Sequence, residues 1–223
     1  MKFGRKSRTN AEPTATDADQ TPVEAEADSG ETVTTEAATT NAGPFDVADV
    51  DVENDGVERV DLGSILIAPA EGLELRLQVD ESSSEVQSVL IAGPTGAVEV
   101  KAFAAQRNGD LWSDVRRQIA SETARQGGTA TEIEGAHGTE LVCQRTVRSP
   151  EGTTTQQPSR IVGFNGPRWF LRATYLGRPA VSPDEAGSWE EAVASVVVRR
   201  GDGPMAPGEQ LPLTLPPQAR RVD

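Results

Sequence analysis

The sequence is poor in the residues on which metal binding and nucleophilic catalysis most often depend. One cysteine, Cys143, and one histidine, His137, occur among its 223 residues. A single cysteine excludes an internal disulfide, which is typical of a reducing compartment. A zinc site needs three or four Cys, His or carboxylate ligands at suitable spacing. We therefore predict no metal site, with Cys143 buried on a strand and His137 at an incidental turn.

Motifs that bind phosphates or activate a serine are also missing. The chain contains no Gly-x-x-x-x-Gly-Lys-Ser/Thr sequence, no Gly-x-Gly-x-x-Gly opening a helix, and no Gly-x-Ser-x-Gly elbow. Gly127-Gly128 follows a predicted helix, at the end where the dipole disfavours an anion. We predict no cofactor and no catalytic residue, and the pattern favours a non-enzymatic protein.

Basic residues are absent from one long stretch of the chain. Residues 9–58 contain fourteen Asp and Glu and no Lys or Arg, whereas residues 1–8 contain four basic side chains. The remainder is nearly balanced, so the net charge of −14 comes mainly from this stretch. Because nucleic-acid binding depends on clustered cations, we predict no nucleic-acid partner.

Long hydrophobic runs are absent as well. No window approaches the roughly 18 apolar residues of a membrane span, and the basic start leads into polar residues instead of the apolar core of a secretory signal. These features predict a cytoplasmic protein with no transmembrane segment. The basic residues 1–8 leave weak contact with an anionic membrane surface as an alternative.

Composition divides the chain into three parts. Residues 1–56 combine the basic start with an acidic Thr/Ala/Glu/Pro-rich stretch whose only aromatic residue after position 8 is Phe45, so we predict a disordered arm. Residues 57–201 carry the hydrophobic patterning of one domain, and residues 202–223 form a proline-rich, extended tail. The arm is either a solubilising segment or a docking segment.

The period of the hydrophobic pattern changes along residues 57–201. Alternating residues such as Leu73, Leu75 and Leu77 predict strands. Asp110 caps a predicted amphipathic helix, and a second helix begins at one of two capping boxes, Ser182-Pro183-Asp184-Glu185 or Ser188-Trp189-Glu190-Glu191. Asn165-Gly166 predicts a hairpin. The fold class is therefore α+β: a mainly antiparallel sheet with two helices packed on one of its faces.

Three segments carry a resemblance to a known family. Residues 163–172 with their Gly-Pro-Arg-Trp core, residues 196–201, and residues 211–216 with their Leu-Pro-Leu sequence are similar to those of an uncharacterised actinobacterial family, known as a domain of unknown function. The resemblance covers roughly residues 57–217 and brings no activity, ligand or catalytic residue. The order of elements also looks like that of the Mog1/PsbP-like α+β domains, and fold alone does not determine function.

The predicted hairpin carries the candidate binding site. If its strands pair, alternation gives an Arg/Phe surface suited to a protein partner or a small anion. That surface consists of Arg160, Phe164, Arg168, Phe170 and Arg172. The alternatives are that a helix covers Phe170 while the arginines pair with nearby carboxylates, that the acidic arm rests on this surface, or that the protein is a hydrolase using carboxylates and arginines.

Overall fold

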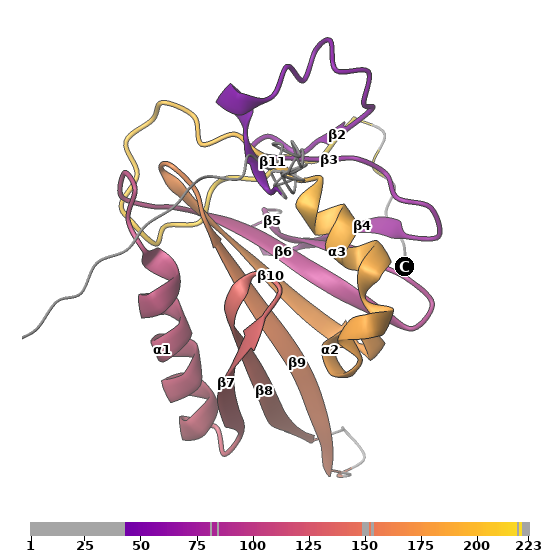
Figure 1. Ribbon diagram of the computed structural model, residues 1–223, viewed down its shortest axis with the longest axis vertical. Helices are drawn as coiled ribbons and strands as arrows, with labels where there is room; N and C mark the ends of the chain where they lie inside the picture. The colour runs from indigo at the N-terminus through magenta and orange to yellow at the C-terminus, as the bar shows by residue number, and fades with distance from the viewer. Residues whose placement is uncertain are drawn as a thin grey trace, which may run out of the picture. The chain divides into compact units, whose positions relative to one another are not determined.

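The computed structural model describes residues 43–217 and 219, with the exception of residues 81, 84, 149–151 and 153. Most of the predicted disordered arm, residues 1–42, lies outside the described part. Figure 1 shows the arrangement of the helices and strands.

Seven strands form the main sheet. Their spatial order is β4–β5–β6–β10–β9–β8–β7, and every neighbouring pair is antiparallel. The strands are β4 (Glu74–Val79), β5 (Val86–Ala92), β6 (Gly96–Ala104), β7 (Thr129–Gly135), β8 (Gly138–Arg148), β9 (Thr154–Asn165) and β10 (Trp169–Gly177). The predicted α+β class with a mainly antiparallel sheet is confirmed.

Helix α1 (Leu111–Arg125) is the longest helix in the described part of the chain, and the others are short. These are α2 (Arg178–Val181) and α3 (Gly187–Ala194), with the single 3₁₀ turns η1 (Val47–Asp49) and η2 (Pro183–Glu185). The Asp110 side chain accepts from the Ser113 amide, which confirms the predicted cap of α1. At Ser182-Pro183-Asp184-Glu185 the chain forms only the turn η2, in which the Ser182 side chain makes no cap bond, and α3 begins at Gly187, also without a side-chain cap.

The two longer helices cover opposite faces of the main sheet (Figure 1). This corrects the prediction that the helices share one face. The reason lies in the sheet's central strands: adjacent residues Phe170 and Leu171 of β10 are both 0% exposed, so each face of this strand needs a cover. Helix α1 approaches its face closely at Gly163, where an added Cβ would lie 2.3 Å from Cδ2 of Trp112.

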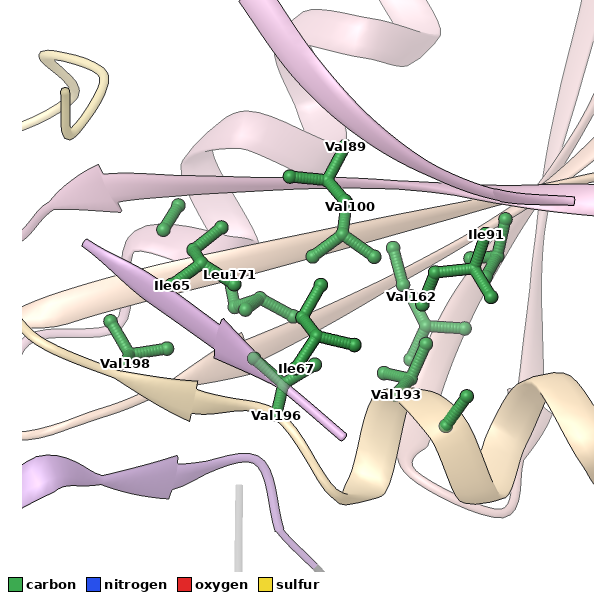
Figure 2. Packing of buried hydrophobic residues seen from close by; sticks show 14 of the residues in the cluster. Ile65, Ile67, Val89, Ile91, Val100, Val162, Leu171, Val193, Val196 and Val198 are labelled. Atoms are coloured by element: carbon green, nitrogen blue, oxygen red, sulfur yellow. The ribbon is translucent and has the colours of Figure 1, made fainter. Parts of the chain in front are cut away.

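A second, smaller sheet completes the domain. Its strands, in the order β1–β11–β3–β2, are β1 (Phe45–Asp46), β11 (Val197–Val198), β3 (Ile65–Ile67) and β2 (Val60–Asp61). Figure 2 shows the larger core, in which Ile65 and Ile67 of this sheet, Val193 and Val196 at α3, and Leu171 of the main sheet point toward one another. Burial of these aliphatic side chains is the main term that stabilises the fold.

Regular structure begins earlier along the chain than the predicted domain start at Val57. Strand β1 pairs in parallel with β11, and the Phe45 amide donates to the Val196 carbonyl at 2.9 Å. The indole Nε1 of Trp169 donates to Asp46 Oδ2 at 2.7 Å. These contacts join residues from the acidic stretch to strands far away in sequence, which is why local composition did not predict them.

The proline-rich tail lies along the main sheet where β5 stops pairing with β6. The Gly208 amide donates to the Ala104 carbonyl, and the Leu211 amide donates to the Ala102 carbonyl, each at 2.8 Å. Leu211 is 1% exposed and belongs to the larger core. The described part of the tail therefore belongs to the folded domain.

Candidate functional site

The register of β9 and β10 divides the predicted Arg/Phe surface between two faces. Arg160 lies opposite Tyr175, and Phe164 lies opposite Leu171, so both point toward the α3 side of the sheet. Phe170 and Arg172 lie opposite Asn165 and Gly163 and point toward the α1 side. The prediction of one continuous surface was therefore wrong.

Arg160 is an interior residue. Its side chain is 3% exposed, and it donates to Glu140 Oε2 at 3.0 Å and to Glu190 Oε1 at 2.6 Å. Its Cζ lies 4.3 Å from the ring centroid of Tyr175. Phe164 is half-buried and its ring lies 5.0 Å from that of His137. Arg160 therefore contributes to no open binding surface, and Phe164 is only partly exposed.

Phe170 and Arg168 also lie apart from each other. Phe170 is fully buried beneath α1, where its ring stacks on Trp112 at 5.9 Å and lies 5.9 Å from Phe103. Arg168 is half-buried at the start of β10, beside the hairpin turn. The alternative in which a helix covers Phe170 is what the structure shows, and Arg172, one of the five candidates, lines a cleft beneath that helix.

That cleft, which we call the α1 cleft, lies between α1 and the main sheet. Its volume is about 530 Å³. Apolar side chains come from both walls: Val115 and Ile119 from α1, and Phe103 and Ile161 from the sheet. Pro207 and Gly208 of the tail complete the lining. The volume falls in the range of small-molecule sites, which are typically ~300–1,000 Å³.

Arg172 faces this cleft with an incompletely satisfied guanidinium. Its Cζ lies 5.4 Å from the ring centroid of Phe103. Its Nε is buried and has no hydrogen-bond partner within the part of the chain that the structure describes. Burial lowers the pKa of Arg172, Glu99 opposes this shift, and the nearby charge of Arg145 lowers the pKa further. The group stays cationic at neutral pH, so it favours an anionic partner.

The acidic side chains around the α1 cleft are paired with cations, but two of its basic side chains have no carboxylate partner among the described residues. Each carboxylate that lines it has its own cation: Glu99 pairs with Lys101 at 3.2 Å, Asp114 with Arg117 at 2.5 Å, and Glu122 with Arg125 at 2.9 Å. Among the described residues, the two arginines of the cleft, Arg145 and Arg172, form no ion pair. Because the two guanidinium groups repel each other, an anion between them would be favoured.

Sequence reasoning missed Arg145, although a signal for it was present. It alternates with Leu141 and Cys143 on β8, and those two residues are 0% exposed on the α1 face. A charged residue at the end of such a buried row marks the place where the row reaches solvent. The sequence did not predict that α1 packs over this face to form the cleft, because three strands separate α1 from β10 along the chain.

The other chemistry-bearing residues lie away from the cleft or are covered. Cys143 is fully buried, burial raises the pKa of its thiol, and Thr123 Oγ1 contacts its sulfur at 3.9 Å. His137 lies at the β7–β8 turn. The described residues include no cluster of three His, Cys, Asp or Glu side chains that could hold a metal ion. No helix in the described ranges is both long enough and apolar enough to cross a bilayer.

Comparisons with known proteins give a family and a distant likeness in fold. A family model described as "Protein of unknown function (DUF3710)" matches residues 43–222, which confirms the resemblance to a family of unknown function. No curated protein matches the chain. A crystal structure from Bacteroides thetaiotaomicron is 17% identical over 60% of this chain, with a TM-score of 0.36, and this chain spans 45% of its length.

A second solved structure is similar at the same low level. The solution structure of cyanobacterial PsbP (CyanoP) from Synechocystis sp. PCC 6803 is 13% identical, with a TM-score of 0.33, over 64% of this chain and 92% of that one. At such scores neither likeness supports a statement about what this chain binds.

Proposed function

From the geometry of the α1 cleft we propose that the domain binds a small amphipathic anion. The chain belongs to the DUF3710 family, whose function is unknown, so family membership does not identify the ligand. The ligand carries a carboxylate or phosphate group that pairs with Arg172 and Arg145. Its apolar body lies against Phe103, Val115 and Ile119. The single, buried cysteine supports a cytoplasmic setting for this binding.

The observation that carries the proposal is the imbalance of charge at Arg172. A guanidinium that is largely removed from water and lacks a carboxylate partner costs free energy unless a ligand satisfies it. The cation–π contact with Phe103, 5.4 Å from Cζ to the ring centroid, restricts the side chain, so less side-chain entropy is lost when an anion binds. The site is therefore preorganised for a planar, bidentate group.

The alternative of a hydrolase has weaker support. It requires two or more carboxylates that converge on a substrate without cation partners. The three carboxylates that line the α1 cleft are each paired with a lysine or arginine. Because these carboxylates pair with Lys101, Arg117 and Arg125, they do not neutralise Arg172 and Arg145, which can then bind an anionic ligand.

Sodium decanoate, decyl phosphate and decan-1-ol test the proposal, because they share an apolar chain and differ in the head group. The Nε–H resonance of Arg172 in a ¹⁵N correlation spectrum reports contact directly. We expect one or both anions to shift this resonance and the alcohol to leave it unchanged. Arg172→Met should weaken anion binding by about 10-fold or more.

The matched control is Arg178→Met, which removes an exposed arginine outside the cleft. Its affinity for the anions should equal that of the unchanged protein. Equal binding of decanoate and decan-1-ol, or undiminished anion binding in Arg172→Met, would contradict the proposal. A response to decyl phosphate alone identifies a phosphate ester as the ligand class, and a response to decanoate alone identifies a carboxylate.

A further inference from the structure

Strand β4 is an edge of the main sheet. Within the described part of the chain it pairs with β5 alone, so the backbone groups on its other side have no strand partner. Glu74 and Arg76 project from it into solvent, with side chains 72% and 59% exposed, and form a bridge at 2.7 Å. An open edge of this kind is a template for adding another strand.

The sequence around this edge is self-complementary. Residues 73–77 read Leu-Glu-Leu-Arg-Leu, with apolar residues at the centre and both ends and opposite charges between them. Two copies paired antiparallel about Leu75 would place Glu74 of each copy opposite Arg76 of the other. Leu73 would lie opposite Leu77 on the core side of the sheet. The pairs from Leu73 to Leu77 are favourable in this register, whereas Gln78 and Val79 would lie opposite Gly72 and Glu71, outside β4.

Competing arrangements are less favourable. A shift that centres the pairing on Arg76 places this arginine opposite its own copy, which is a repulsive pair. The other edge of the sheet, β7, carries Glu132 and Glu134 on one face. Pairing all seven residues of β7 with a second copy would place Glu132 opposite itself. Like charge therefore disfavours this full-length pairing of β7, although Arg116 pairs with Glu132 at 2.7 Å, and it disfavours the β4 register centred on Arg76.

We propose that two copies of this chain associate through β4, antiparallel about Leu75, so that their main sheets join into one continuous sheet. The association is independent of the α1 cleft, because β5 and β6 separate β4 from the strand that carries Arg172. Few residues take part, so the dimer is a weak one that forms reversibly with concentration.

Sedimentation equilibrium over a concentration series tests the proposal on the full chain. The unchanged protein should shift from 23.6 kDa toward twice that mass as concentration rises. Arg76→Glu and Glu74→Arg should each weaken association by about 10-fold or more, since each turns both attractive pairs into repulsive ones. The double variant Glu74→Arg/Arg76→Glu restores attraction and should associate like the unchanged protein.

A mixture of the two single variants, Arg76→Glu and Glu74→Arg, tests the pairing of charges across the interface most directly. One copy then presents two arginines and the other two glutamates, so the mixture should form a heterodimer although each variant alone is monomeric. Arg117→Glu, an exposed charge reversal on α1, is the control and should leave association unchanged. Circular dichroism checks that every variant is folded.

Three outcomes would overturn the proposal. The first is an unchanged protein that stays fully monomeric at about 1 mM, a concentration at which a dimer with a Kd of about 1 mM would contain half of the chains. The second is single variants that associate as strongly as the unchanged protein. The third is a double variant or a mixture that does not recover association.

Discussion

Nη1 of Arg160 lies 3.0 Å from Glu140 Oε2 in the interior of the domain, with both side chains at most 3% exposed. Glu190 of α3 reaches the same guanidinium at 2.6 Å, and the Tyr175 ring lies beneath it. Arg160 thus joins β8, β9 and α3. The burial of this arginine explains why it cannot serve as a surface binding residue.

Replacing Arg160 with Met should destabilise the protein by about 3–5 kcal/mol, because Glu140 would stay buried without a cation. Urea unfolding measures this difference in free energy. The double variant Arg160→Met/Glu140→Leu should recover part of the loss, since no charge then remains without a partner. A loss below about 1 kcal/mol in the single variant, which is the size typical of exposed pairs, would show that the pair is not desolvated.

The free energy of unfolding should fall as the pH rises above about 10 because of Tyr175, the single tyrosine of the chain. Burial raises the pKa of Tyr175 in the folded protein, and the charge of Arg160 only partly offsets this. Above the unfolded pKa, the unfolded chain releases the phenol proton while the folded chain retains it, so unfolding is favoured.

Urea unfolding from about pH 8 to about pH 11 measures this dependence. Tyr175→Phe should remove it. At neutral pH the same variant should be as stable as the unchanged protein or more so, because the Tyr175 hydroxyl is buried without a partner among the described residues. Parallel pH curves for the two proteins would contradict the assignment to Tyr175.

Asn165→Ala should destabilise the protein by about 1–2 kcal/mol through the start of α1. The Asn165 Oδ1 accepts from the amides of Leu111 and Trp112 at 3.1 and 3.2 Å, so the tip of the β9–β10 hairpin caps a helix distant in sequence. Urea unfolding measures the loss. Asn54→Ala, at an exposed asparagine whose side chain bonds to Asp51 alone among the described residues, serves as the control and should change stability little.

Leu211→Ala should cost about 2–5 kcal/mol, whereas Leu215→Ala should stay within about 0.5 kcal/mol of the unchanged protein. The two residues lie in the same proline-rich tail, but Leu211 is 1% exposed and Leu215 is 50% exposed. Thermal or urea unfolding compares them. If both substitutions are neutral, the tail is not part of the folded core.

Local patterns in the sequence predicted the elements whose causes are local. Alternation at Leu75 and Leu77 predicted β4, Asp110 predicted the start of α1, and Asn165-Gly166 predicted the β9–β10 hairpin. Each of these signals acts within a few residues: the strand pleat, a side chain that caps an amide, and the backbone freedom of a turn.

Composition and local pattern by themselves determined an α+β domain with a mainly antiparallel sheet, and the absence of a second cysteine excluded an internal disulfide. Only the tertiary structure decided the register that places Arg160 and Arg172 on opposite faces, and the packing of α1 that makes a cleft at Arg172. Such contacts join residues far apart along the chain, and their free energy depends on which faces are buried together, which no local pattern specifies.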